Sequence, residues 1–356
     1  MTKKLGIAII GCGMIAKSHA EAILSDGRAE LVAAAYGTNV EKGTAFAKQF
    51  GIPRIVGDYH ELLDDSSIDA VCICTPSSLH AECAVDFALR GIHILCEKPL
   101  DVAKDKMTAM ITAAKEHNVV LGCVFPNRTI PTLQKAKAIL ESGELGPMRI
   151  VEFQYRGYRS PTYFTSSKWK GTKEYDGGGA LMNQGIHGID LMLYLTGDVA
   201  SVCADVDTLG RKIEVEDTAS ALLRFKNGAK GVLMGTTLSH VPEPSPEGDC
   251  IRIECDRGTV LYSKGKTTIF RNRSENEFDI EVIQLDPPDA DCTNSGSAPE
   301  NINMEGHQII VSNFISASLG EEEIMIPAES ARRAVDLVLT IYESSKTGSW
   351  LPVCYE

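Results

Sequence analysis

Short apolar runs alternate with helical patterns through the first third of the chain. The apolar runs occupy residues 4–11, 31–36, 69–75, 92–98 and 118–124. Stretches with apolar residues at helical spacing lie between most of them, one ending at residue 25 and others covering 41–50, 81–90 and 104–115. Near-continuous apolar strands separated by helices are typical of a parallel sheet that is covered on both faces. The pattern therefore predicts a doubly wound α/β domain over residues 1–125.

The pattern changes beyond residue 126. A helical pattern at 132–142 precedes segments in which apolar and polar residues alternate, and two helical patterns close the chain, near 308–319 and 328–343. Such alternation favours an antiparallel sheet with one open face. We expect an α+β domain over residues 126–356 with a large, mainly antiparallel open sheet, and leave open whether its final helix packs on the first domain. Residues 286–303, polar and rich in Pro and Ser, predict a long surface loop, either a lid or merely mobile.

Composition narrows the possible partners. The formal charge of −13 argues against nucleic acid or an anionic membrane as a main partner, because Lys and Arg drive binding to phosphates. No apolar segment has the length needed to span a bilayer. The 11 cysteines are scattered, and they form neither the paired spacing of a zinc site nor a small disulfide framework. We expect a cytoplasmic protein with reduced cysteines and no metal site.

The motif "GCGMIA" between the first strand and its helix matches the G-x-G-x-x-G/A fingerprint of a Rossmann dinucleotide site. Gly11 allows the tight turn, Gly13 lets a pyrophosphate approach the backbone, and the helix that begins near Met14 and Ile15 offers its amides to the phosphates. Such a motif alone is weak evidence, since glycines often only make turns. Here strand, helix and further alternation surround it, so we predict a dinucleotide site.

The residues after the second strand bear on cofactor choice. An NAD site usually has an acid there to hold the ribose hydroxyls. This chain has "YGTN" at 36–39 instead, and its first acid is Glu41. With no carboxylate to repel a 2′-phosphate, and with Thr38, Asn39 and Lys42 as donors, we favour NADP over NAD. The alternative is an ordinary loop with NAD held by backbone groups.

Two later strand ends also carry polar residues. Thr75, Pro76 and Ser77 follow one strand, where the carboxyl edge of a parallel sheet receives its ligand. Glu97 and Lys98 end the following strand, in "CEKP", and we count them among the cofactor-binding residues. Without the other motifs, this charged pair would be interpreted as the solvated end of a strand. His80 could equally cap its helix, so we leave it out of the chemistry.

Together, "GCGMIA", "EKP" and "DGGGALMNQGIHGIDLMLYLTG" resemble the Gfo/Idh/MocA family, the glucose–fructose oxidoreductase and inositol dehydrogenase group, over essentially the whole chain. The resemblance implies a Rossmann domain followed by a domain with a large antiparallel sheet. It implies oxidation or reduction of sugars, sugar nucleotides or polyols with NAD or NADP, and a homodimer or homotetramer formed through the sheet face. The family's catalytic lysine and histidine map to Lys98 and His187.

The substrate-binding candidates are Asn127, Tyr163, Trp169, Asn183 and His187. An aspartate often stands where this chain has Asn183, and an amide can hold a hydroxyl but cannot take its proton. Helical spacing places Asn183 and His187 on one polar stripe, with Asp190 and Tyr194, beside a core-facing stripe. Asn127 and Arg128 could border the nicotinamide or simply start a helix, and Trp169 could equally anchor its loop.

These residues predict a hydride-transfer site. His187 would act as general base in oxidation and general acid in reduction, since an unperturbed imidazole titrates near neutrality. Lys98 would hydrogen-bond the reacting oxygen. Two alternatives stay open: a non-catalytic NAD(P)-binding regulatory protein, against which intact Lys98 and His187 speak, and an NAD-dependent glycosidase on the same fold.

Overall fold

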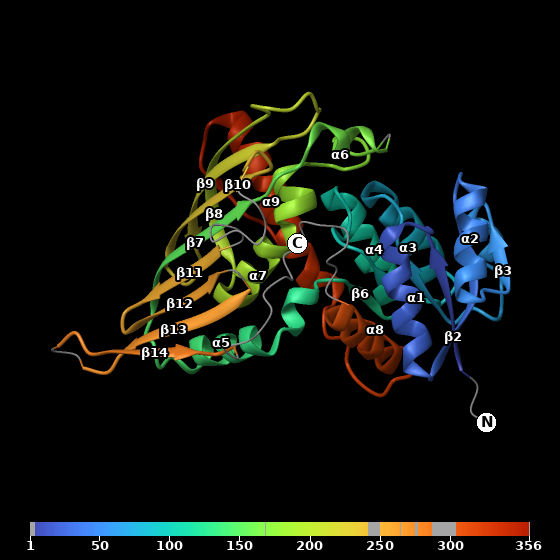
Figure 1. Cartoon of the computed structure of the whole chain (residues 1–356), viewed down its shortest axis with the longest axis horizontal. Coiled ribbons are helices and arrows are strands. Elements are labelled where there is room, and N and C mark those ends of the chain that lie inside the picture. Colours follow the sequence, from blue (N-terminus) through green and yellow to red (C-terminus); the bar gives the residue numbers. More distant parts are fainter. Residues whose placement is uncertain are drawn as a thin grey trace. The chain divides into compact units, whose positions relative to one another are not determined.

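The computed structural model describes residues 4–167, 169–240, 250–263, 265–274, 277–286 and 304–355 (Figure 1). Apart from residue 286, the loop expected at 286–303 lies outside the described residues. The described chain divides into two compact units, residues 4–126 with 304–332 and residues 127–286 with 333–355. In this grouping residue 126 and residues 304–332 lie with the first unit, whereas the expected domains placed them in the second.

The first unit contains a six-stranded parallel sheet in the order β3-β2-β1-β4-β5-β6. Its strands are β1 (Leu5–Ile10), β2 (Ala29–Ala35), β3 (Arg54–Val56), β4 (Ala70–Ile73), β5 (His93–Cys96) and β6 (Leu121–Cys123). Its helices are α1 (Met14–Asp26), α2 (Val40–Phe50), α3 (His80–Ala88), α4 (Lys104–Glu116) and α8 (Met304–Ser318), with short 3₁₀ turns η1 (Tyr59–Leu62) and η2 (Ser77–Leu79). Every residue of β1 and β4 is buried, as the apolar runs predicted. The strand order is that of dinucleotide-binding sheets, and the predicted Rossmann fold is confirmed.

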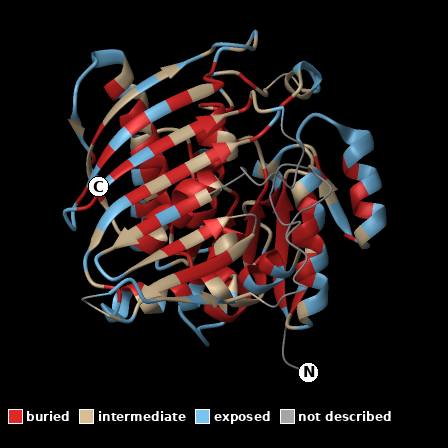
Figure 2. Ribbon diagram, turned by 60° about the vertical axis from the view of Figure 1, so that its left-hand side comes forward, coloured by how far each residue is buried: buried red, intermediate tan, exposed pale blue. Residues whose placement is uncertain are grey.

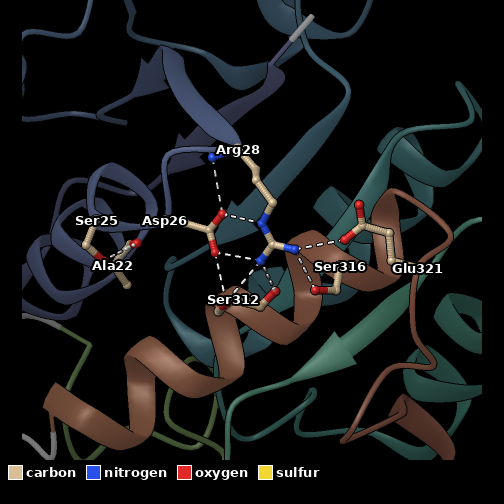
Figure 3. Close-up of polar contacts among 7 residues, drawn as sticks. All are labelled: Ala22, Ser25, Asp26, Arg28, Ser312, Ser316 and Glu321. Carbon is tan, nitrogen blue, oxygen red and sulfur yellow. Dashed lines mark hydrogen bonds and ion pairs between the residues drawn. The ribbon is translucent and has the colours of Figure 1, made fainter. Parts of the chain in front are cut away.

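Helix α8 joins the first unit through Arg28, just beyond the end of α1 (Figure 3). The Arg28 guanidinium donates to Ser316 Oγ (2.8 Å), to Glu321 Oε2 (2.9 Å) and to both Asp26 oxygens (2.7 and 2.8 Å). Ser312 Oγ also donates to Asp26 Oδ2 at 2.8 Å. The hydrogen bonds from Arg28 hold the pKa of Asp26 below its ordinary value. A charged cluster thus ties two helices that are far apart in the sequence.

The second unit contains a nine-stranded mixed sheet in the order β14-β13-β12-β11-β7-β10-β9-β8-β15. Neighbouring strands are antiparallel except for the parallel pair β7 and β10. The strands are β7 (Met148–Arg156), β8 (Val199–Asp207), β9 (Thr218–Phe225), β10 (Lys230–Thr236), β11 (Cys250–Cys255), β12 (Gly258–Ser263), β13 (Lys266–Asn272), β14 (Ile280–Gln284) and β15 (Leu351–Pro352). The helices are α5 (Pro131–Ser142), α6 (Pro161–Thr165), α7 (Ile186–Thr196) and, from Arg333 onward, α9 (Ala328–Thr347). They are joined by the π-helical turn η4 (Ala180–Gly185) and by the 3₁₀ turn η3 (Pro126–Thr129), whose first residue belongs to the first unit. The predicted α+β architecture is confirmed.

One face of this sheet is packed and the other is open. Helices α5, α7 and α9 lie on the packed face (Figure 1). Burial alternates along the strands, as Figure 2 shows, and β9 is typical, with its odd-numbered residues from Ala219 to Phe225 buried and its intervening residues exposed. On the open face, four large apolar side chains are 43–55% exposed: Ile150, Leu222, Val232 and Val282.

Candidate functional site

The glycine-rich loop of the first unit has the conformation that its motif predicts. Gly11 has φ +99°, and a Cβ atom there would lie 2.6 Å from the carbonyl oxygen of Cys74, so only glycine fits against the end of β4. A Cβ atom on Gly13 would meet nothing within 4 Å, and Gly13 caps α1 with no side-chain hydrogen bond among the described residues. The first amides of α1, near Met14 and Ile15, are therefore left to a ligand such as a pyrophosphate.

The turn after β4 offers a second feature that fits a cofactor. The Thr75 hydroxyl is buried and has no hydrogen-bond partner in the described part of the chain. Ser77 is buried in η2, directly after Pro76. His80 is buried too, and its ring contacts the carbonyl oxygens of Thr75 (3.0 Å) and Pro99 (2.8 Å). His80 thus has a structural position, while the buried Thr75 hydroxyl suits a hydroxyl-rich ligand.

The loop after β2 is exposed and lacks a carboxylate. Gly37 has φ +68°, a left-handed conformation that glycine adopts without strain. Asn39 Oδ1 accepts from the amide of Lys42 (2.9 Å) and so caps α2, which leaves its amide nitrogen and the Thr38 hydroxyl as donors. Glu41 lies within the first turn of α2.

Glu97 takes part in a buried cluster at the end of β5. His19 Nε2 lies 2.8 Å from Glu97 Oε1, and His307 Nε2 lies 3.9 Å from the same oxygen. Burial raises the pKa of Glu97, but the charges and hydrogen bonds of His19, His307 and Lys98 outweigh it and lower this pKa to about 2. Burial also disfavours the charged form of His19 and so lowers its pKa. The contacts of His19 with Cys74, Cys72 and Glu97 outweigh burial and hold this pKa well above the ordinary value. Glu97 is therefore an ionised carboxylate inside the fold.

Lys98 follows directly from this cluster. Its amide donates to Glu97 Oε2 at 3.1 Å, and a cis peptide joins it to Pro99. The backbone on either side of Lys98 is thus fixed, by Glu97 before it and by the His80 contact with Pro99 after it. Its ammonium group is carried on a well-anchored strand end.

In the second unit, the glycines before His187 are required by packing. A Cβ atom on Gly178 would lie 2.2 Å from Tyr342 Oη, and one on Gly179 would lie 2.0 Å from the Glu216 carbonyl oxygen. The buried Glu216 carboxylate accepts from the amides of Gly179 and Leu181 and from the Tyr342 hydroxyl, each at 2.8 Å. Burial raises the pKa of Glu216. These contacts fold residues 180–185 into a π-helical turn.

This turn changes the helical geometry expected around His187. The predicted core-facing stripe is buried: Met182, Ile186, Ile189 and Leu193. However, regular α-helix begins only at Ile186, so the even spacing expected from Asn183 onward is wrong for the first turn. Asp190 is buried rather than displayed on a polar face, and it accepts from Arg128 Nε (2.8 Å) and Nη2 (2.5 Å). Arg128 and Asp190 thus form a structural ion pair, and His187 itself is half-buried.

Asn183 belongs to a network that sequence reasoning did not identify. It donates to the buried carboxylate of Asp176 and accepts from Gln184 Nε2 at 2.8 Å. Gln184 Nε2 also donates to Tyr163 Oη (3.0 Å), and Gln184 Oε1 accepts from Arg159. The structure therefore brings together the predicted Tyr163 and Asn183 and adds Asp176, Gln184 and Arg159. The sequence held one sign of this network, because Asp176 and Gln184 lie in the same motif as His187.

Other predicted residues stand apart from this network. The Asn127 and Trp169 side chains form no hydrogen bonds within the described chain, and both are partly exposed. The backbone carbonyl oxygen of Trp169 accepts from the Thr172 hydroxyl. This contact is compatible with Trp169 as a loop anchor and with Trp169 as a substrate contact. Lys98 lies in the first unit and His187 in the second. Their action on one substrate stays a prediction.

Comparison with known proteins supports the motifs. Residues 5–125 match the oxidoreductase family with an NAD-binding Rossmann fold, and residues 133–261 match the GFO/IDH/MocA C-terminal domain. An uncharacterised oxidoreductase YrbE of Bacillus subtilis is 32% identical over 240 residues, which are 65% of this chain and 67% of that protein. Levoglucosan dehydrogenase of Pseudarthrobacter phenanthrenivorans is 30% identical over 273 residues, 67% of this chain and 69% of that protein.

Among solved structures, the WlbA dehydrogenase of Bordetella pertussis, in complex with NADH and UDP-GlcNAcA, is 31% identical, with a TM-score of 0.83 over 99% of both chains. No helix in the described part of the chain has the length and apolar character needed to cross a membrane. Both halves of the chain thus match the two domains of one enzyme family. The chain belongs to the Gfo/Idh/MocA family of NAD-binding oxidoreductases.

Proposed function

We propose that this protein transfers a hydride between a nicotinamide and a carbinol or carbonyl carbon of a sugar, sugar derivative or polyol. The observation that carries the proposal is that each family match contains one member of the catalytic pair, Lys98 in residues 5–125 and His187 in residues 133–261. Relatives named for their substrates support the class, since they include a levoglucosan dehydrogenase, a myo-inositol 2-dehydrogenase and a D-apiose dehydrogenase.

Each residue has a defined task in this proposal. The nicotinamide, when bound, supplies or accepts the hydride. His187 takes the proton from the substrate hydroxyl oxygen during oxidation and returns it during reduction. Lys98 donates a hydrogen bond to the same oxygen and stabilises negative charge that develops on it. The backbone that carries the Lys98 side chain is fixed by the hydrogen bond from the Lys98 amide to Glu97.

For the cofactor, NAD binding follows from the family, and we propose that NADP is preferred. The exposed donors Thr38 and Asn39, with no carboxylate before Glu41, support this choice. The loop of Gly11 and Gly13, the start of α1, and Thr75 to Ser77 would hold the rest of the dinucleotide.

For the assembly, we propose a homodimer or homotetramer formed through the open face of the nine-stranded sheet. Its exposed apolar side chains support this, because large apolar patches on a protein surface mark interaction sites. No disulfide joins the described cysteines, which supports a reducing compartment such as the cytoplasm.

The experiment combines a substrate screen with two variants. Aldoses, inositols, anhydrosugars and nucleotide sugars would be tested with both cofactors by nicotinamide absorbance. We expect Lys98→Ala and His187→Ala to fold and still bind NADPH, since the phosphate contacts lie on the Gly11 loop. His187→Ala should lose roughly 10²–10⁴-fold in kcat, and the double variant should lose far less than the product of the two losses.

The matched controls are His117→Ala and Lys48→Ala, which remove exposed side chains of the first unit and should leave turnover unchanged. Near-normal kcat in His187→Ala would remove this histidine from the mechanism. Cleavage of a glycoside with no net change in nicotinamide absorbance would identify the glycosidase alternative instead.

A further inference from the structure

Arg159 is a buried cation without a carboxylate partner. It is only 8% exposed and follows β7 by three residues. The other buried arginine of the second unit, Arg128, is paired in a bidentate manner with Asp190. Within the described part of the chain, no ion pair joins Arg159 to an acid. Buried arginines are rarely left unpaired, because removing a cation from water is costly.

The contacts of Arg159 leave part of its guanidinium unused. Its Nη1 donates to the Tyr158 carbonyl oxygen (3.1 Å) and its Nη2 to Gln184 Oε1. Both acceptors are neutral. Its Nε is buried and has no hydrogen-bond partner among the described residues. A guanidinium with a free N–H has the geometry that binds carboxylate or phosphate oxygens.

A second arginine stands beside it. Arg211 Nε donates to the Arg159 carbonyl oxygen at 2.9 Å, and Arg211 Nη2 is likewise buried without a partner in the described chain. The buried carboxylate of Asp217 accepts from the amides of Leu209, Gly210 and Arg211 at 2.8 Å each, and so fixes the turn that carries this arginine. The Arg211 guanidinium itself pairs with no acid in the described chain.

A third cationic side chain, Lys170, lies in the same region. Lys170 Nζ lies 4.1 Å from the centre of the Tyr163 ring, and the Arg159 guanidinium carbon lies 5.2 Å from it. Asp176 accepts from the Gly171 amide at 2.8 Å and from Asn183. Arg159 and Lys170 thus both lie against the Tyr163 ring, in a chain whose overall charge is −13.

We propose that Arg159 and Arg211 bind an oxyanion carried by the substrate, a carboxylate or a phosphate, so that the enzyme acts on an acidic sugar derivative rather than a neutral sugar. Arg159 contacts Gln184, which lies three residues before His187 in the sequence. The proposed anion site therefore includes a neighbour of the proposed proton-transfer residue. This inference rests on the proposed function for the placing of the substrate, but binding of the anion does not require turnover.

The test measures binding of small probes to the NADPH-loaded protein by calorimetry. Glucose is the neutral reference; glucuronate carries a carboxylate, glucose 6-phosphate a phosphate, and UDP-glucose a diphosphate. At least one anionic probe should bind roughly 10- to 100-fold more tightly than glucose, as a charge-assisted contact implies. The probe that gains most identifies the anion.

Variants then assign the effect to the arginines. Arg159→Gln should abolish the preference and leave glucose binding within about threefold, Arg159→Lys should keep part of it, and Arg211→Gln should weaken it. Arg149→Gln is the matched control, because Arg149 is exposed and already paired with Asp256. Thermal unfolding checks that each variant is folded, and the comparison of probes on the unmodified protein needs no variant.

Two results would overturn the inference: all three anionic probes binding no more tightly than glucose, or Arg159→Gln weakening glucose and the anions equally. The proposed function fails in a different way. If anions bind through Arg159 but no sugar supports hydride transfer, the anion site stands and the oxidoreductase assignment of substrate falls. If neutral sugars alone are turned over, the oxidoreductase function stands and the proposed anion site falls.

Discussion

Gly37 is the residue at which cofactor choice can be tested most directly. It lies in the turn after β2, it is exposed, and a Cβ atom there would meet nothing within 4 Å. Its positive φ disfavours most side chains, but Asp and Asn tolerate this region better than other residues. A carboxylate can therefore be introduced at this position without a clash. Comparing Asp with Asn there separates the effect of the charge from the effect of backbone strain.

Gly37→Asp should shift the protein toward NADH, because a carboxylate at this position repels a 2′-phosphate and can accept from ribose hydroxyls. We expect the ratio of NADPH to NADH affinity to fall roughly 10- to 100-fold. Gly37→Asn carries the same strain without the charge and should leave the ratio nearly unchanged. Fluorescence titration with both cofactors measures this, and clearly tighter NADH binding by the unmodified protein would contradict the proposed preference.

Single residues also show where sequence reasoning stops. The motif around His187 could be read from the sequence, but the reason for Gly178 and Gly179 could not, because Tyr342 and Glu216 are distant in the chain. Asn183 stays a predicted hydroxyl ligand, but its hydrogen bonds to Asp176 and Gln184 could not be predicted from the sequence. Which partners a polar side chain takes depends on tertiary contacts that local patterns do not contain.

At the scale of elements, length decided what could be predicted. Apolar runs of six to eight residues and amphipathic helices gave clear patterns, so the parallel sheet and most of its helices could be predicted, including the short strand β6 inside the run 118–124. Strands β3 and β15, with three and two residues, are too short to show a period. The π-helical turn η4 could not be predicted, since the Glu216 carboxylate that bonds its amides lies on a different element.

The attachment of α8 gives a prediction at this scale. Arg28→Met removes the hydrogen bonds to Asp26, Ser316 and Glu321 and should lower the free energy of unfolding by about 1–2 kcal/mol, since the side chain is partly exposed. Arg90→Met is the control: Arg90 makes one exposed contact with Asp64 and should cost less than about 0.5 kcal/mol. Urea unfolding measures both.

The effect of Arg28→Met should depend on pH in a defined direction. Arg28 lowers the pKa of Asp26, so its contribution is fully present above the ordinary carboxyl value of 3.8 and is lost as the pH falls below it. The difference between Arg28→Met and the unmodified protein should therefore narrow in acid. A difference that stays constant down to pH 3 would show that Asp26 is not the partner that matters.

At the scale of the whole molecule, the open sheet face should determine assembly. Leu222 on β9 lies opposite Val232 on β10, and both are exposed. The double variant Leu222→Glu with Val232→Glu places like charges at the centre of the proposed interface and should weaken association roughly 100-fold or more. Leu89→Glu, on an exposed leucine of the first unit, should leave the mass unchanged. Light scattering at micromolar concentration measures the mass of each protein in solution, and a monomeric mass for the unmodified protein would contradict the proposal.

The grouping of residues 304–332 with the first unit has a consequence for synthesis on the ribosome. The strands of the NAD-binding sheet all emerge within the first 123 residues, but α8, which Arg28 binds and whose Ile310 and Phe314 are buried, follows some 180 residues later. Domains usually fold as units while the chain is being made. Here the first unit cannot be completed until residues 127–302 of the second unit have been translated, so its apolar surface under α8 stays uncovered while they are synthesised.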